Sequence, residues 1–270
     1  MKVIDLTGQK ALIVGIGNEK SLSAAVARCL HSAGADLALT YHNARTLPYV
    51  KPLAEEVEAE ILLPCEVSDS EQMAEVCEQI RSQWGRLDMV FHAVGAVPKK
   101  DLRGQLVECS EQGFLEAMQV SCYSFIHLAR SVVPLISEGG SILTLTFFGA
   151  ERVVDHYNVM GPVKAALQSS VQYLAHELGP HDIRVNALSA GPVTTRSSSG
   201  ITHFEKLIEE VEKKAPLRRT ASLEEIGDAA LFLLSDYASA ITGEVLHVDS
   251  GHHIEGMVFD DEPEIEISTE

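Results

Sequence analysis

The segment KALIVGIGNEKSLSAAVA, residues 10–27, decides the fold. It opens with a short apolar run that stops at Gly15, as expected for a strand buried on both faces of a sheet. A polar loop containing Gly17 follows, and small residues then begin a helical pattern over about residues 21–33. A strand, a glycine loop and a helix in this order predict the first βα unit of a parallel sheet.

Six more apolar runs follow, separated by helical patterns. The runs cover residues 35–41, 60–67, 87–95, 140–147, 183–191 and 243–251. The helical patterns cover residues 51–59, 70–84, 111–137, 156–179 and 222–236. The runs are continuously apolar rather than alternating, which again indicates burial on both faces. We therefore predict an α/β fold, a Rossmann-type doubly wound parallel sheet of about seven strands with helices on both faces.

The chain shows no linker and no internal repeat, so we expect a single dinucleotide-binding and catalytic domain over residues 1–257. A substrate-binding loop and helix are expected at about residues 194–216. Residues 258–270 carry six acidic side chains and are expected to form a mobile, solvated tail.

The composition excludes several classes of protein. A net charge of −18 argues against a nucleic-acid partner. The sequence has no apolar run long enough to cross a membrane, and its start is a poor signal peptide. Five scattered cysteines and eleven histidines show no metal-ligand spacing, so no metal site is expected. Reduced thiols are typical of a cytoplasmic protein.

The loop after the first strand only partly matches a dinucleotide fingerprint. Gly15 and Gly17 supply G-x-G, but Lys20 stands where the third glycine belongs. Ser21 suits the N-cap of the following helix, whose free N–H groups could face a pyrophosphate. A tight strand–helix turn without a ligand explains the two glycines equally well.

The ends of the second and third expected strands leave the cofactor open between NADH and NADPH. An acid after the second strand favours NADH and a basic residue favours NADPH, but this chain has His42 there, with Arg45 slightly beyond. After the third strand, Glu66 and Val67 stand where an adenine could lie between a polar group and an apolar wall.

Tyr157 and Lys164 lie seven residues apart, which is nearly two helical turns, so they are expected on one face of the helix at 156–179. Pro162 between them removes a helix N–H and predicts a local bend. Alone, such a pair is usually an exposed pair. Beside a nucleotide-binding sheet, however, the lysine can bind a cofactor ribose and favour ionisation of the tyrosine, which then donates to a substrate oxygen.

These residues carry a family resemblance. The chain resembles the short-chain dehydrogenases and reductases, specifically the bacterial NAD(P)H-dependent enoyl-(acyl-carrier-protein) reductase branch, in which six residues separate the tyrosine and lysine. Matching stretches run nearly end to end and include GIGNEKSLSAAVA, YNVMGPVKAAL, IRVNALSAGPVTT and ITGEVLHVDSGHHIEGM. The acidic tail lies outside the resemblance.

The resemblance implies reduction of the carbon–carbon double bond of a trans-2-enoyl thioester by hydride from NADH or NADPH, with NADH slightly favoured. Tyr157 and Lys164 would be the catalytic residues. Cofactor-binding residues would be Gly15, Ile16, Ser21, Leu22, His42, Glu66, Val67, Gly95, Lys164, Val193 and Thr195. Substrate-binding residues would be Ala96, Val97, Phe147, Tyr157 and Ser197. The thioester would be carried on acyl carrier protein or coenzyme A, in fatty-acid biosynthesis, and the enzyme would be a cytoplasmic homotetramer.

Two departures from the family pattern bear on the substrate. Phe147 stands where many members carry a second tyrosine, and it keeps the ring without the hydroxyl. The loop at 196–201 reads RSSSGI where an apolar segment is usual, which predicts a different preference for chain length or polarity. Two alternatives stay open, a carbonyl reductase of the same superfamily and a catalytically silent cofactor-binding relative. Ser121 in the place of the usual asparagine favours enoyl reduction over the first.

Overall fold

The computed structural model describes residues 4–137, 139–195 and 202–256. Seven strands form one sheet in the order β3-β2-β1-β4-β5-β6-β7, and every neighbouring pair is parallel. The strands are β1 (Lys10–Ile16), β2 (Asp36–Tyr41), β3 (Ile61–Pro64), β4 (Met89–His92), β5 (Gly140–Thr146), β6 (Ile183–Ala190) and β7 (Val245–Val248). The predicted doubly wound sheet of seven strands is confirmed.

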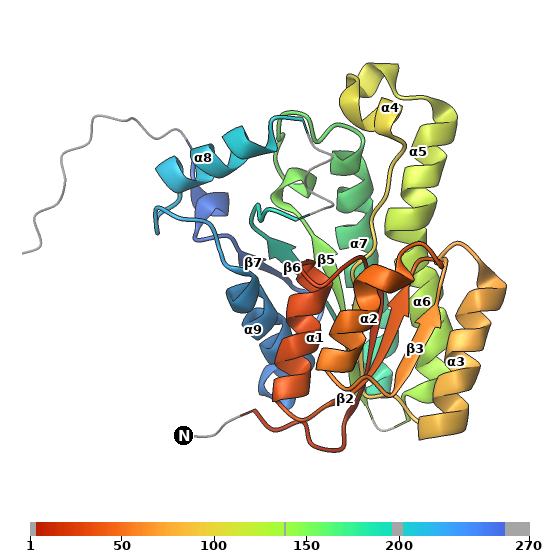
Figure 1. Cartoon of the computed structure of the whole chain (residues 1–270). Coiled ribbons are helices and arrows are strands. Elements are labelled where there is room, and N and C mark those ends of the chain that lie inside the picture. The colour runs from red at the N-terminus through yellow and green to blue at the C-terminus, as the bar shows by residue number, and fades with distance from the viewer. Residues whose placement is uncertain (1–3, 138, 196–201, 257–270) are drawn as a thin grey trace, which may run out of the picture.

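Each face of the sheet has its own hydrophobic core, because successive residues of a strand point to opposite faces. Leu12 and Val14 of β1 lie in one core, whereas Ala11 and Ile13 lie in the other. Helices α1 (Leu22–Ser32), α2 (Leu47–Glu56) and α9 (Leu223–Leu234) cover the second face, and α3 (Ser70–Trp84), α6 (Ser124–Val132) and α7 (Met160–Leu178) cover the first. Figure 1 shows these layers, with α1, α2 and α9 toward the viewer.

Two helical predictions need correction. The expected helix at 111–137 is three elements, α5 (Glu111–Met118), a π-helical turn (Gln119–Tyr123) and α6. A π turn inserts an extra residue and re-aims the side chains around it, here Ser121. Two further helices lack a strong sequence signal, α4 (Lys99–Arg103) and α8 (Phe204–Lys214).

The helix expected at 156–179 begins only at Met160, so Tyr157 lies in the turn before it. The prediction that Tyr157 and Lys164 share one helical face is therefore wrong. Pro162 is the third residue of α7, and the first four N–H groups of a helix have no partner within it. Its missing N–H thus breaks no helical hydrogen bond, and the reason for the predicted bend disappears.

Within the described ranges, no helix combines the length and the apolar character that a membrane span requires.

Candidate active site

The loop after β1 is built for close approach of backbone. Gly15 has φ +96°, and a β-carbon there would lie 2.6 Å from the Ala93 carbonyl oxygen. Only glycine fits this position, between the ends of β1 and β4. A β-carbon on Gly17, in contrast, would meet nothing within 4 Å, so that side of the loop is open to a ligand.

The start of α1 continues this open surface. Ser21 is the N-cap, as predicted, and its hydroxyl accepts from the Ala24 N–H at 3.2 Å. Leu22 is the first helical residue, so the free N–H groups of the first turn lie next to the glycine loop. Ile16 is 1% exposed, and only its backbone can therefore reach a ligand. A glycine loop leading into a helix N-terminus fits a dinucleotide pyrophosphate.

The side chains of His42 and Glu66 are hydrogen-bonded across the ends of β2 and β3. The His42 Nδ1 lies 2.9 Å from the Glu66 Oε2, and the Ser68 hydroxyl donates to the other carboxylate oxygen at 2.9 Å. A carboxylate only accepts, so Nδ1 carries the proton and the Nε2 of a neutral His42 is left as an acceptor. Val67 beside this pair is buried and presents an apolar wall.

The loop after β4 lies against Lys164. A β-carbon on Gly95 would be 3.9 Å from the Lys164 Nζ and 3.8 Å from the Ser121 hydroxyl. That hydroxyl accepts from the Ala96 N–H at 3.0 Å and lies 3.1 Å from the Ala96 carbonyl oxygen, to which it donates. Ser121 thus fixes the loop, while Val97 packs against the core.

The buried His92 lies at the end of β4, just before this loop. His92 ends β4 and is hydrogen-bonded to Thr144 and Ser124, at 3.0 and 2.9 Å. Burial, together with the charge of Lys164, lowers the pKa of His92 to about 3. The imidazole is therefore neutral and joins β4, β5 and α6 without adding charge to the site.

Tyr157 is buried beside two residues of the loop after β5. Its ring lies 4.9 Å from that of Phe147, centroid to centroid, at 59°. A β-carbon on Gly149 would lie 2.4 Å from the Tyr157 Cδ1, so the ring rests directly on that glycine. Burial raises the pKa of the phenol, and no residue in the described part of the chain hydrogen-bonds its hydroxyl. The phenol is therefore neutral and can act as a hydrogen-bond donor.

The turn that carries Tyr157 is unusual in its backbone. His156 and Asn158, on either side of it, have φ of 64° and 45°. These left-handed conformations cost energy in residues other than glycine and are held by surrounding contacts. One such contact is the Asn158 side chain, which donates to the Leu102 carbonyl of α4 at 2.7 Å.

Lys164 is 7% exposed, and its Nζ donates to the Leu145 carbonyl of β5 at 2.7 Å. Burial lowers its pKa to about 8. The ammonium therefore remains mostly protonated at neutral pH, and Gly95 leaves space beside it.

For the remaining expected site residues, the structure gives only their position and burial. Val193 and Thr195 follow β6, and both are half-buried. Ser197 and the rest of the loop at 196–201 lie outside the described residues. Two cavities flank residues 152–156, one of about 490 Å³ that Tyr157 lines and one of about 660 Å³ that His156 and His203 line.

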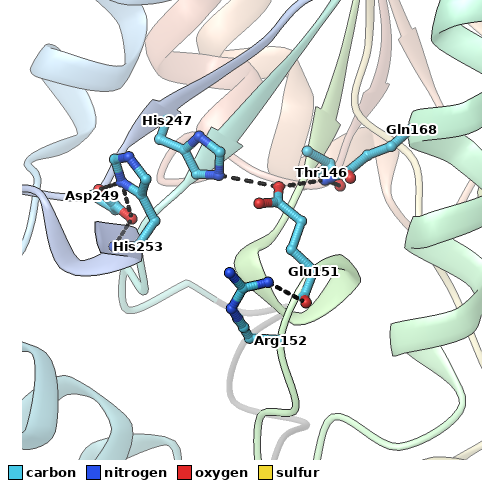
Figure 2. A network of polar contacts seen from close by, with 7 residues as sticks. All are labelled: Thr146, Glu151, Arg152, Gln168, His247, Asp249 and His253. Carbon is cyan, nitrogen blue, oxygen red and sulfur yellow. Dashed lines mark hydrogen bonds and ion pairs between the residues drawn. The ribbon is translucent and has the colours of Figure 1, made fainter. Parts of the chain in front are cut away.

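Sequence reasoning missed a polar network next to the turn that contacts Tyr157. Glu151 lies between His247 of β7 and Gln168 of α7, and Figure 2 shows all three pointing toward one another. The three residues come from distant parts of the chain. No spacing rule links them, and only the fold brings them together.

The comparisons with known proteins agree on one family. The family model described as enoyl-(acyl carrier protein) reductase matches residues 15–253. The chain is 45% identical over 253 residues to enoyl-(acyl-carrier-protein) reductase (NADH) FabI of Bacillus cereus, covering 93% of this chain and 99% of that protein. It is 44% identical over 262 residues to enoyl-(acyl-carrier-protein) reductase (NADH) 1 of Rhizobium meliloti, covering 97% and 96%.

Solved structures give the same result. The Anaplasma phagocytophilum enoyl reductase, solved in complex with NAD, has 46% identity and a TM-score of 0.91, and the match covers 95% of this chain and 98% of that one. The Bacillus cereus enzyme was solved with NADP+ and indole naphthyridinone, and it has 45% identity, a TM-score of 0.91 and coverage of 93% and 99%.

Proposed function

The chain belongs to the enoyl-(acyl-carrier-protein) reductase family of the short-chain dehydrogenases and reductases, and from this we propose that it reduces the double bond of a trans-2-enoyl thioester. The observation that carries the proposal is the placement of a buried phenol, Tyr157, and a buried ammonium, Lys164, beside the glycine loops of a nucleotide-binding sheet. Bound NADH supplies the hydride that reaches the β-carbon of the substrate.

We propose that Tyr157 stabilises the charge that develops on the thioester oxygen. Its phenol is protonated at neutral pH because burial raises its pKa, so it donates a hydrogen bond there. Phe147 and Gly149 fix the ring on two sides, so the donor is oriented before the substrate arrives. Phe147 has no hydroxyl, so of these two aromatic residues only Tyr157 can donate a hydrogen bond to the thioester oxygen.

Lys164 would hold the nicotinamide ribose beside Gly95. In the structure the ammonium donates to the Leu145 carbonyl, and its two other N–H groups are free in direction to reach ribose hydroxyls.

We propose a preference for NADH that is set at His42 and Glu66. With Nδ1 donating to Glu66, the Nε2 of a neutral His42 accepts a hydrogen bond from a ribose hydroxyl, as an acid at the end of β2 does in related folds. The Glu66 carboxylate also repels a 2′-phosphate. Arg45 has no ion-pair partner within the described ranges and is the residue that could bind such a phosphate.

The remaining properties are proposals from family membership. Residues 1–257 would act as one domain, with α8 as the helical part of the substrate-binding segment. The thioester would arrive on acyl carrier protein, and the enzyme would be a homotetramer. The five cysteines are free thiols, which fits a cytoplasmic protein.

The experiment is to follow NADH oxidation with a short enoyl thioester and with the corresponding 3-oxoacyl thioester. We expect turnover with the enoyl substrate, and turnover with the oxo substrate alone would assign the chain to carbonyl reduction. Tyr157→Phe should lose most of kcat and keep its affinity for NADH, whereas Lys164→Ala should lose both. Saturable NADH binding without turnover on either substrate would contradict the enzymatic proposal.

A further inference from the structure

We propose that Glu151 and His247 form a positioning pair that holds Tyr157 and Lys164 in place relative to each other. This inference rests on the proposed function, because it concerns the same two residues. Neither member of the pair contacts the Tyr157 ring or the Lys164 ammonium, so the pair acts through the elements between them.

Glu151 is held from two sides. Its Oε1 lies 3.1 Å from the His247 Nε2 and 3.2 Å from the Gln168 Nε2 (Figure 2). The His247 side chain is 15% exposed and that of Glu151 33%, so the histidine is sheltered while the carboxylate is partly open to water. The carboxylate accepts from two side chains at once, and hydrogen bonds to a charged acceptor are stronger than those between neutral groups.

The first connection runs from Glu151 to Tyr157. Glu151 follows the one-turn helix at residues 148–150, and its N–H donates to the Phe148 carbonyl at 2.9 Å. Gly149 in that turn is the glycine on which the Tyr157 ring rests. The contacts of the Glu151 carboxylate therefore fix the residue next to the turn on which the ring rests.

The second connection runs from Glu151 to Lys164. Gln168 lies four residues after Lys164 on α7, on the same helical face. Its Nε2 is shared between Glu151 and the Thr146 hydroxyl of β5, at 3.2 Å each. Lys164 donates to Leu145, the residue before Thr146. Glu151 therefore links the turn that contacts Tyr157 to the helix and strand that hold Lys164.

His247, the member of the pair on β7, is itself held by neighbouring residues. The His247 ring stacks on that of His253, with centroids 4.0 Å apart and planes at 16°. His253 is bound to the buried carboxylate of Asp249 at 2.9 Å (Figure 2). His252, the residue before His253, packs edge-on against Phe148 of the turn at residues 148–150. β7 and the residues after it therefore contact residues 148–151 at two points, His247 at Glu151 and His252 at Phe148.

Loss of the carboxylate should loosen the turn and let water reach the phenol. Glu151→Ala removes the shared acceptor, whereas Glu151→Gln keeps a carbonyl oxygen that can accept from both His247 and Gln168. The matched control is Glu78→Ala, which removes an exposed carboxylate bound by Arg81 on α3. His247→Ala tests the pair from β7 if Glu151→Ala does not fold.

Three quantities should be measured for each variant: kcat with an enoyl thioester, Kd for NADH, and the ionisation of Tyr157. The last is read by ultraviolet difference titration, with Tyr157→Phe subtracted. We expect Glu151→Ala to lose about 10- to 100-fold in kcat while the Kd for NADH changes less than about twofold. The pKa of Tyr157 should fall toward its ordinary value. Glu151→Gln should recover most of kcat, and Glu78→Ala should match the parent protein.

Two results would overturn the positioning role. One is a folded Glu151→Ala protein with unchanged kcat and unchanged Tyr157 ionisation. The other is a loss of kcat that Glu151→Gln does not recover, with the tyrosine titration unmoved. The titration needs no substrate, so it still tests the pair if the parent protein fails to reduce enoyl thioesters and the proposed function falls.

Discussion

Replacing Gly149 by alanine should displace the Tyr157 ring. The added methyl carbon would lie 2.4 Å from the Tyr157 Cδ1 and 2.8 Å from its Cε1. Ordinary contacts between carbons are about 3.5–4.0 Å. The backbone at Gly149 is not in the left-handed region, so the methyl group itself is the cause of any effect.

The ring has to retreat by about 1 Å to restore an ordinary contact. Phe147 stands against it at 4.9 Å, centroid to centroid, so the retreat moves the hydroxyl as well as the ring. Overpacking of this kind costs about 1–3 kcal/mol, which corresponds to a melting temperature lower by about 2–12 °C. A shift of about 1 Å in a catalytic group costs up to about 100-fold in rate.

The assay compares kcat, Kd for NADH and Tm for Gly149→Ala and for Gly179→Ala. Gly179 lies at the end of α7 with φ −54°, and a β-carbon there meets nothing within 4 Å. We expect the Gly149 variant to lose kcat with little change in Kd, and the Gly179 variant to match the parent protein. Parental kcat and Tm in Gly149→Ala would refute the argument that the glycine is required by the ring.

Two further predictions concern charge. Burial lowers the pKa of Lys164 to about 8, so its ammonium is lost as pH rises through 8, and equilibrium titrations should show NADH affinity falling above that pH. The pKa of Lys164 in the folded protein is below its ordinary value of 10.5, so the free energy of unfolding should rise between pH 8 and 10.5. This rise should be absent in Lys164→Met. If the difference in unfolding free energy between the two proteins does not change over that pH range, the burial of the charge is contradicted. Glu66→Gln should raise the affinity for 2′,5′-ADP relative to ADP by roughly tenfold, measured by calorimetry, because a repelling carboxylate is removed. An unchanged ratio would show that Glu66 does not select the cofactor.

The sheet was predictable because its signal is local. Residues 11–14 are apolar throughout, and the structure buries them between two cores. The central strands β4, β5 and β6 are buried in the same way, whereas the outer strands β3 and β7 are only partly buried. Ser21 was also predictable, since a serine ahead of small helical residues is an N-cap signal.

The environment of Tyr157 was not predictable in the same way. Its neighbours suggested a helix, but His156 and Asn158 adopt left-handed conformations, and Asn158 is held by α4, a helix that the sequence barely signals. Tertiary contacts decided the backbone there. The partners of Glu151 also depend on distant segments, because His247 lies 96 residues further along the chain.

The turn that carries Tyr157 changes what the spacing to Lys164 means. Each residue inside a helix rotates the next side chain by about 100°, so a residue inserted within α7 ahead of Lys164 would swing the ammonium away from Gly95. A residue inserted before Met160 would only lengthen the tether, leaving the helix and its lysine where they are. The number of residues between tyrosine and lysine is therefore a loop length rather than a helical pitch. Relatives of this fold can differ in that number while keeping the same two groups at the same place.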